Sequence, residues 1–559
     1  MSMDARSWVP HRAPGAIVRF WNSFSASGLY VGTLFFAASL TPSLLPRTFL
    51  TQGILSGVCL AAGYGIGVFG RWLAHYMEFP EPNERILRAV KYVSVALCAV
   101  VAVTFLWQAA EWQNSIRTLM GLAPVDSAHP LRTGLIAAVT FVLLIAAARL
   151  FQLVLTFTSA RLRRFIPRRM ANVVGIAVAV ALFWVAIEGV LFRFGLRAAD
   201  ASFQAYDELI EPDTERPSDP RKTGSAASQI AWSDLGRAGR EFVASGPSAD
   251  ELAGFWGGDA FEPIRVYVGL NAADTPEARA ELALRELERT GAFERSVLVI
   301  ITPTGTGWID PAAIDTLEYL HDGDVASVSV QYSYLTSWLS LLVEPDYGTW
   351  TARALFSAVY EHWHNLPEND RPRLYLHGLS LGAFGSEASN EFFEVLGDPY
   401  HGALWSGPPF ASRIWQYVTS QREPGSPAWL PRFRDGSFVR FTNQIDGLDI
   451  PGAEWGPMRI VYLQYASDPI TFFDYHSLYR QPDWIDQPRG PDVSPELRWY
   501  PVITFFQLAL DMALATTAPM GHGHVYAPED YIDAWVEVTA VEGKTSDEIA
   551  RLRQMFARR

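Results

Sequence analysis

Cysteine is nearly missing from this chain of 559 residues: only Cys59 and Cys98 occur, and both lie within apolar runs. Two cysteines so placed exclude a disulfide scaffold and a cysteine-ligated metal site. Clustered positive charge is also lacking after about residue 198, and the formal net charge is −14. Because binding to phosphates needs a concentrated basic surface, we expect no nucleic-acid partner. We also expect no metal and no cofactor.

Charged residues are rare in five long apolar runs in the first part of the chain. The runs cover residues 28–46, 52–74, 88–110, 132–157 and 172–195. Each is close to the roughly 20 residues that cross a bilayer as a helix. Five such runs in succession favour membrane spans over buried helices of a soluble protein. The first run has no clear cleavage site, so we interpret it as a retained anchor rather than a signal peptide.

The basic residues between these runs are distributed asymmetrically. They gather before the first run, between the second and third, and between the fourth and fifth: Arg6, Arg12, Arg19, Arg71, Arg85, Arg88, Lys91, Arg161, Arg163, Arg164, Arg168 and Arg169. Because basic loops stay in the cytoplasm, five spans predict a cytoplasmic amino terminus and an extracytoplasmic, periplasmic position for the chain after about residue 198. We therefore expect a multi-pass protein of the cytoplasmic (inner) membrane in contact with membrane lipids.

The remainder of the chain has the composition of a soluble domain. We expect a five-span transmembrane domain over residues 1–197, a polar linker over 198–260 and a catalytic domain over 261–559. From Ile264 onward, short apolar or β-branched segments alternate with segments of helical spacing. This alternation predicts an α/β domain with a doubly wound, mostly parallel sheet.

A serine between two glycines follows one of these predicted strands. Residues 373–382 read Arg-Leu-Tyr-Leu-His-Gly-Leu-Ser-Leu-Gly, with Ser380 between Gly378 and Gly382. In a nucleophile elbow a strand turns sharply into a helix, and glycines leave room around the serine. The pattern alone arises by chance, but the apolar strand before it and the small residues after it favour an elbow.

An acid and a histidine follow this serine along the chain, which is the order of the catalytic triad in an α/β-hydrolase. A predicted strand ends in Ser-Asp-Pro, which places Asp468 at the carboxyl end of the sheet. A turn-capping role is the alternative for Asp468, and Asp446 and Asp449 are the other candidate acids. His522 and His524 precede a predicted helix that begins near Pro528. The turn just before this helix favours His524, while His522 stays open; a metal pair would lack a third ligand nearby.

Two backbone donors are expected to stabilise the charge that develops on an attacked carbonyl oxygen. One is the amide of Leu381, directly after the serine. The other is expected at Thr304 or Gly305, in the glycine-containing loop after the predicted strand 297–301, although a simple turn explains this loop equally well.

With these motifs in place, the chain resembles a bacterial family of membrane-anchored α/β-hydrolases. The likeness covers nearly the whole chain and is most specific around residues 377–382, 465–469 and 489–495 and the two histidines. It implies a triad of Ser380, Asp468 and one of the two histidines. The apolar helical run at residues 500–515 is then an insert that serves as a lid, an acyl-binding wall or a membrane-facing element.

The sequence therefore predicts a serine hydrolase of the esterase or lipase type that cleaves an ester or related acyl bond. An apolar or lipid-derived acyl ester is the expected substrate. The alternatives are an acyltransferase that uses the same triad and a non-catalytic membrane scaffold with the hydrolase fold.

Overall fold

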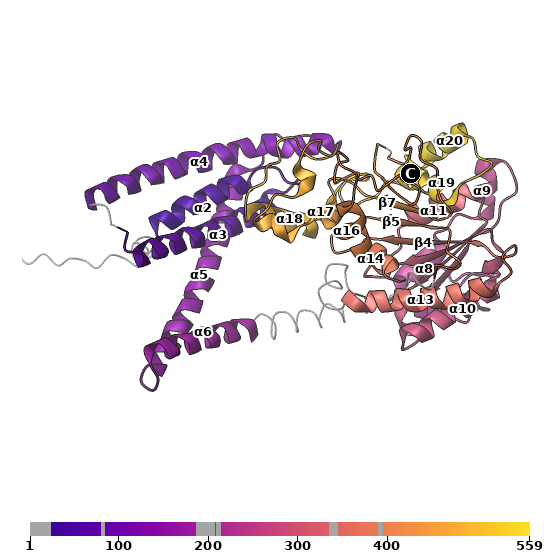
Figure 1. Cartoon of the computed structure of the whole chain (residues 1–559), viewed down its shortest axis with the longest axis horizontal. Coiled ribbons are helices and arrows are strands. Elements are labelled where there is room, and N and C mark those ends of the chain that lie inside the picture. Colours follow the sequence, from indigo (N-terminus) through magenta and orange to yellow (C-terminus); the bar gives the residue numbers. More distant parts are fainter. Residues whose placement is uncertain are drawn as a thin grey trace, which may run out of the picture.

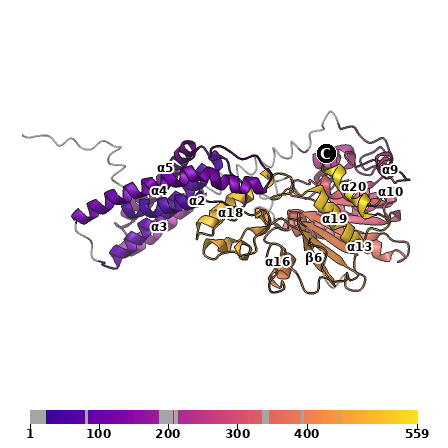
Figure 2. The same cartoon turned by 90° about the horizontal axis from the view of Figure 1, so that it is seen from above.

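The computed structural model describes residues 24–79, 84–185, 207, 214–334, 345–389, 395–445 and 447–558. The molecule is elongated, with a group of long helices at one end and a sheet covered by helices at the other (Figures 1 and 2). The helices of the first group are α2 (Ala26–Ser39), α3 (Phe49–Tyr76), α4 (Glu84–Leu119), α5 (Pro130–Leu162) and α6 (Arg168–Trp184).

Three helices in the described part of the chain are long and apolar enough to cross a bilayer. They are α3, the Tyr92–Leu119 part of α4, and α5. Helix α2 has 14 residues, which at about 1.5 Å per residue is shorter than the roughly 30 Å of a hydrocarbon core. The fifth predicted span, residues 172–195, is helical to Trp184, and residues 186–195 lie outside the described residues, as do Arg6, Arg12 and Arg19.

The prediction of one continuous helix over residues 28–46 is wrong. The helix ends at Ser39, and residues 40–48 are irregular. Pro42 disfavours helical dihedrals in the residue before it, and Pro46 interrupts the same segment again. Residues 40–48 are mostly buried, so this connection between α2 and α3 packs inside the protein instead of crossing a bilayer.

Glycines allow the long helices to approach one another closely. A Cβ on Gly32 of α2 would lie 2.8 Å from the Leu60 carbonyl oxygen of α3, and one on Gly57 of α3 would lie 2.7 Å from the Ala137 carbonyl oxygen of α5. Small residues at helix interfaces are typical of membrane helix packing.

The sheet at the other end has seven strands, all parallel, in the order β1-β3-β2-β4-β5-β7-β6. The strands are β1 (Ile264–Val268), β2 (Val297–Thr302), β3 (Val325–Val330), β4 (Arg373–Leu379), β5 (Gly402–Ser406), β6 (Val439–Thr442) and β7 (Arg459–Leu463). Nearly every strand residue is buried, as expected for parallel strands with helices on both faces. The predicted fold class is confirmed.

Helices cover both sides of this sheet. The described helices at this end of the molecule are α8 (Gly236–Ala244), α9 (Ala249–Trp256), α10 (Pro276–Thr290), α11 (Pro311–Leu320), α13 (Pro345–Asn365), α14 (Leu381–Glu387), α16 (Arg413–Ser420), α17 (Pro469–Phe472), α18 (Ile503–Ala513), α19 (Pro528–Thr539) and α20 (Ser546–Phe556). Helix α10 packs on α13, and α13 packs on α14, whereas α11 packs on α19. In Figure 1, α10 and α13 lie on one side of the strands, and α11 and α19 lie on the other.

The described residues of the predicted linker belong to this domain. Trp232, Phe242 and Leu252 are buried in the same apolar core as the sheet, and the Thr223 hydroxyl donates to the Arg265 carbonyl of β1 at 3.0 Å. The domain therefore begins before residue 261, and residues 214–260 differ from the linker that their polar composition suggested.

The two ends of the molecule are joined through the insert at residues 500–515. Helix α18 packs against α2 and α3 and lies between the long helices and the sheet in both views (Figures 1 and 2). Leu44, Leu45, Ile116 and Met120 belong to the same apolar core as the sheet. The connection after α2 and the end of α4 are therefore built into the α/β domain.

Candidate active site

The turn after β4 holds Ser380 in a strained conformation. Its φ is +57° and its ψ is −124°, a combination that residues other than glycine rarely adopt. A Cβ on Gly378 would lie 2.3 Å from the Gly382 carbonyl carbon, and one on Gly382 would lie 2.2 Å from the Thr302 carbonyl oxygen. The Ser380 amide donates to the Ser406 carbonyl of β5 at 3.0 Å. This strand, turn and helix have the local geometry that the motif predicted.

Asp468 follows β7 and is completely buried. Its Oδ1 accepts a hydrogen bond from the Ile470 amide at 2.8 Å and so caps α17. Its Oδ2 accepts from the Tyr526 hydroxyl at 2.6 Å and lies 2.7 Å from His524 Nδ1. Capping and contact with a histidine, which the sequence presented as alternatives, therefore coexist on the two oxygens of one carboxylate. Asp449 is exposed, and Asp446 lies outside the described residues.

His524 is 8 % exposed and is oriented by Asp468. Because the carboxylate already accepts from Tyr526 and the Ile470 amide, it acts as an acceptor toward Nδ1, which leaves Nε2 without a proton in the neutral ring. Nε2 is buried and has no hydrogen-bond partner among the described residues. This is the tautomer that a general base requires.

The imidazole of His524 lies against the strand beside the nucleophile turn. A Cβ on Gly407 would lie 2.6 Å from His524 Cε1, and Gly407 has a φ of +49°. Gly407 directly follows Ser406, whose carbonyl accepts the Ser380 amide. The fold thus brings His524, Asp468 and the Ser380 turn to the carboxyl ends of three adjacent strands, β4, β5 and β7.

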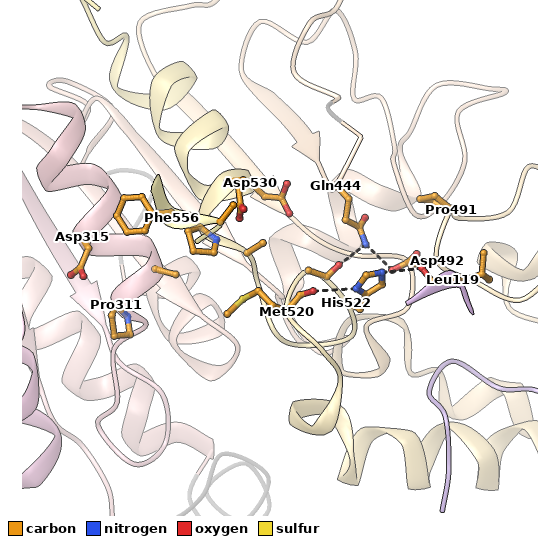
Figure 3. A pocket seen from close by; sticks show the side chains of 16 residues that line it. Leu119, Pro311, Asp315, Gln444, Pro491, Asp492, Met520, His522, Asp530 and Phe556 are labelled. Atoms are coloured by element: carbon orange, nitrogen blue, oxygen red, sulfur yellow. Dashed lines mark hydrogen bonds between the residues drawn. The ribbon is translucent and has the colours of Figure 1, made fainter. Parts of the chain in front are cut away.

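His522 points to a different place. Its Nδ1 lies 3.2 Å from the Met520 carbonyl oxygen, and its Nε2 lies 3.2 Å from the Leu119 carbonyl oxygen at the end of α4. Figure 3 shows it in the wall of a cavity of about 900 Å³ that Asp492 and Gln444 also line. The two histidines therefore do not converge, and the described residues contain no group of three or more His, Cys, Asp or Glu that could hold a metal.

A buried carboxylate that the sequence did not single out ties the histidine loop to the acid loop. Asp492 Oδ2 accepts from the Ser467 hydroxyl at 2.5 Å and from Gln444 Nε2 at 2.9 Å. The Ser467 hydroxyl accepts from the Gly523 amide at 2.8 Å, and Gln444 also donates to the Gly521 carbonyl at 2.9 Å. Figure 3 shows the Gln444 bonds. Asp492 lies in the segment 489–495, which stood out in the sequence only as one of the segments that carry the resemblance to the hydrolase family.

The loop after β2 lies beside the nucleophile turn, but its Thr304 amide is not free to act as the predicted oxyanion donor. The Thr304 amide donates to the Trp308 carbonyl at 3.0 Å, so this N–H is engaged within its own turn. Leu381 is the first residue of α14, where backbone amides have no partner inside the helix. Gly305 is buried in the same loop as Thr304. Of the predicted oxyanion donors, the geometry favours the Leu381 amide.

A second buried carboxylate lies in the electrostatic environment of His524. Asp310 caps α11 through the Ala312 amide at 3.0 Å and accepts from the Tyr531 hydroxyl at 3.2 Å. Burial raises the pKa of Asp310 to about 6, although the hydrogen bonds from the Ala312 amide and the Tyr531 hydroxyl and, more weakly, the proximity of His524 act in the opposite direction. No pattern in the sequence marks Asp310, because an Asp-Pro pair at a helix start is common.

Two family models match the chain. Residues 264–552 match the alpha/beta-hydrolase family, and residues 40–247 match the alpha/beta-hydrolase family N-terminus. No curated protein and no solved structure matches the chain. The two matched ranges together include helices α3 to α6, the connection after α2 and the whole sheet.

Proposed function

Because the chain belongs to the alpha/beta-hydrolase family, we propose that it is a serine hydrolase that cleaves an ester or related acyl bond. Ser380 is the nucleophile, His524 the general base and Asp468 the carboxylate that orients the base. One observation carries the proposal. His524 Nδ1 lies 2.7 Å from Asp468 while its Nε2 is buried and unpartnered among the described residues, beside the strained Ser380 turn.

In this mechanism the Ser380 hydroxyl attacks the carbonyl carbon of the ester and passes its proton to His524 Nε2. The Leu381 amide stabilises the oxyanion, and the protonated histidine then gives its proton to the leaving alcohol. Water attacks the resulting acyl-enzyme with His524 again acting as base. Asp468 remains ionised throughout and holds the imidazole in one orientation.

The proposed substrate is an apolar or lipid-derived acyl ester. Helices apolar enough to enter a bilayer lie next to the catalytic domain, which supports a substrate drawn from membrane lipids. The aromatic ring of Phe473, at the end of α17, contacts the rings of Phe410 and of Phe505 on α18. Such a surface suits an acyl chain better than a charged metabolite.

We further propose that the catalytic domain lies outside the cytoplasm. The connections that contact this domain, after α2 and after α4, lie at the helix ends opposite the basic segments 71–91 and 161–169. Basic segments stay in the cytoplasm. Protease added to intact spheroplasts is expected to digest the catalytic domain; digestion only in inside-out vesicles would reverse the orientation.

The decisive experiment is labelling of the purified full-length protein with a fluorophosphonate probe. Wild type is expected to be labelled and to hydrolyse chromogenic acyl esters, with rates that vary with chain length. Ser380→Ala is expected to lose both, whereas Ser386→Ala, a buried serine on the same helix, is expected to keep both.

The same experiment separates the alternatives. Absence of labelling, together with identical behaviour of wild type and Ser380→Ala, would leave a non-catalytic scaffold with this fold. Preferential transfer of the acyl group to an added alcohol would make the protein an acyltransferase, since the same acyl-enzyme serves both reactions.

A further inference from the structure

Arg47 lies in the connection between α2 and α3 and forms a fully buried ion pair with the insert. Its Nε lies 3.2 Å from Asp511 Oδ1 on α18, and neither side chain is exposed. The second oxygen of Asp511 accepts from the Leu44 amide at 2.9 Å. A buried ion pair of this kind is costly to break, because removal of one partner leaves the other as an unpaired charge without solvent.

The same arginine also forms hydrogen bonds with side chains of the neighbouring helices. Its Nη1 donates to Gln52 Oε1 of α3 at 2.9 Å, and its amide donates to Gln113 Oε1 of α4 at 2.6 Å. Gln507 of α18 adds a bond to the Thr41 carbonyl at 3.0 Å. A single buried network therefore fixes the carboxyl-terminal helix α18 to three elements of the amino-terminal part.

From α18 the chain leads directly to the catalytic histidine loop. The His524 amide donates to the carbonyl of Ala515, two residues beyond the end of α18, at 3.2 Å. A Cβ on Gly523 would lie 3.2 Å from Leu45 Cδ2, and the Leu119 carbonyl lies 3.2 Å from His522 Nε2. Residues of the amino-terminal part thus touch the loop at the two positions directly before His524.

We propose that Arg47 and Asp511 are positioning residues for His524, so that the long helices form part of the catalytic machinery in addition to anchoring it. The proposal rests on the proposed hydrolase function. Transfer of the serine proton requires Nε2 within hydrogen-bond reach, and a displacement of about 1 Å costs on the order of 100-fold in rate. A pair that only stabilised the fold would lower the melting temperature without altering the rate of the folded enzyme.

The test compares Asp511→Asn and the milder Gln507→Leu with wild type, all as full-length protein in detergent micelles. The control is Glu318→Gln, which breaks an equally buried pair with Arg265 at the β1 edge of the sheet. Three quantities are measured: kcat and KM for an acyl ester as a function of pH, the rate of fluorophosphonate labelling, and hydrogen exchange of the segment 515–526.

We expect Asp511→Asn to lower kcat and the labelling rate by about 10- to 100-fold with little change in KM, and to speed exchange in segment 515–526. Gln507→Leu is expected to give smaller changes in the same direction. Glu318→Gln is expected to lower the melting temperature while kcat, the pH profile and this exchange stay as in wild type.

Wild-type kcat and wild-type exchange in folded Asp511→Asn would overturn the proposal; if that variant does not fold, the same result in Gln507→Leu would do so. Failure of the proposed function looks different, because then wild type itself is neither labelled nor active. Exchange in segment 515–526 still reports in that case whether α18 docking holds the histidine loop.

Discussion

The Ser380 turn and the histidine loop (residues 519–526) lie in one candidate site but are held in different ways. The turn is fixed by residues close in sequence and by the adjacent strands, through glycine contacts and the Ser406 carbonyl. The histidine loop is fixed by side chains and carbonyls distant in sequence, among them Asp468 and Leu119. A turn of the first kind is encoded locally, whereas a loop of the second kind depends on the whole assembly.

The largest effect within this comparison is expected for Asp468→Asn. Asparagine keeps the cap on α17 but presents a neutral group to His524 Nδ1. The protonated imidazole then lacks a negative charge beside it, and no carboxylate keeps the proton of the neutral ring on Nδ1. We expect kcat to fall by roughly 10³- to 10⁴-fold, measured by steady-state hydrolysis of a chromogenic ester.

Tyr526→Phe serves as the matched control for this substitution. It removes the 2.6 Å bond to the same carboxylate and leaves the charge in place, so we expect a loss of only about fivefold, in line with one hydrogen bond. Equal losses in the two variants would mean that packing around Asp468, and not its charge, supports the reaction.

An intermediate effect is expected for Asp492→Asn, which tests whether the histidine loop is held from a distance. Asparagine replaces the carboxylate by a neutral amide, which weakens the bonds that Oδ2 accepts from Ser467 and Gln444, so the chain from Asp492 through Ser467 to Gly523 loosens. We expect kcat to fall by about tenfold, with the fluorophosphonate labelling rate falling in parallel.

Ser467→Ala breaks the same chain at its middle, and the double variant is therefore expected to lose no more than the larger single loss. Additive losses would show that the two side chains act separately, and the network would then not be the unit that holds the loop.

The sequence predicted the parts of this protein whose signals are local. The predicted strands at 297–301, before Ser380 and before Asp468 appear in the sequence as short apolar segments, and the structure has β2, β4 and β7 at these positions. Gly378 and Gly382 predicted the turn around Ser380, because the backbone approaches both positions too closely for a residue with a Cβ.

The sequence could not predict the parts that depend on packing between distant segments. Residues 40–48 are apolar enough for a span, but Pro42 and the burial of Arg47 against Asp511 turn them into a connection inside the α/β domain. Residues 214–260 are polar overall, yet a few apolar side chains such as Trp232 suffice to attach them to the core. Asp492 gave no pattern because its partners lie up to 48 residues away.

The smallest effect on activity is expected for Glu387→Gln, on the Ser380 side of the comparison. Glu387 ends α14, accepts from the Tyr462 hydroxyl at 3.0 Å and is buried. Burial raises the pKa of its carboxyl from 4.5 to about 8. This group is therefore neutral at pH 7, and glutamine closely imitates its protonated form.

Because the folded-state pKa of Glu387 lies above the unfolded value, its contribution to stability is complete below about pH 4.5 and is lost as the pH rises through about 8. Glu387→Gln removes this titration, so its melting temperature is expected to decline less than that of wild type between those pH values, while kcat at pH 7 changes by less than about twofold. Glu361→Gln, on the exposed side of α13, is expected to follow the wild-type curve. Parallel curves for wild type and Glu387→Gln would mean that Glu387 is ionised in the fold, and the Ser380 side would then hold a buried charge as the histidine side does.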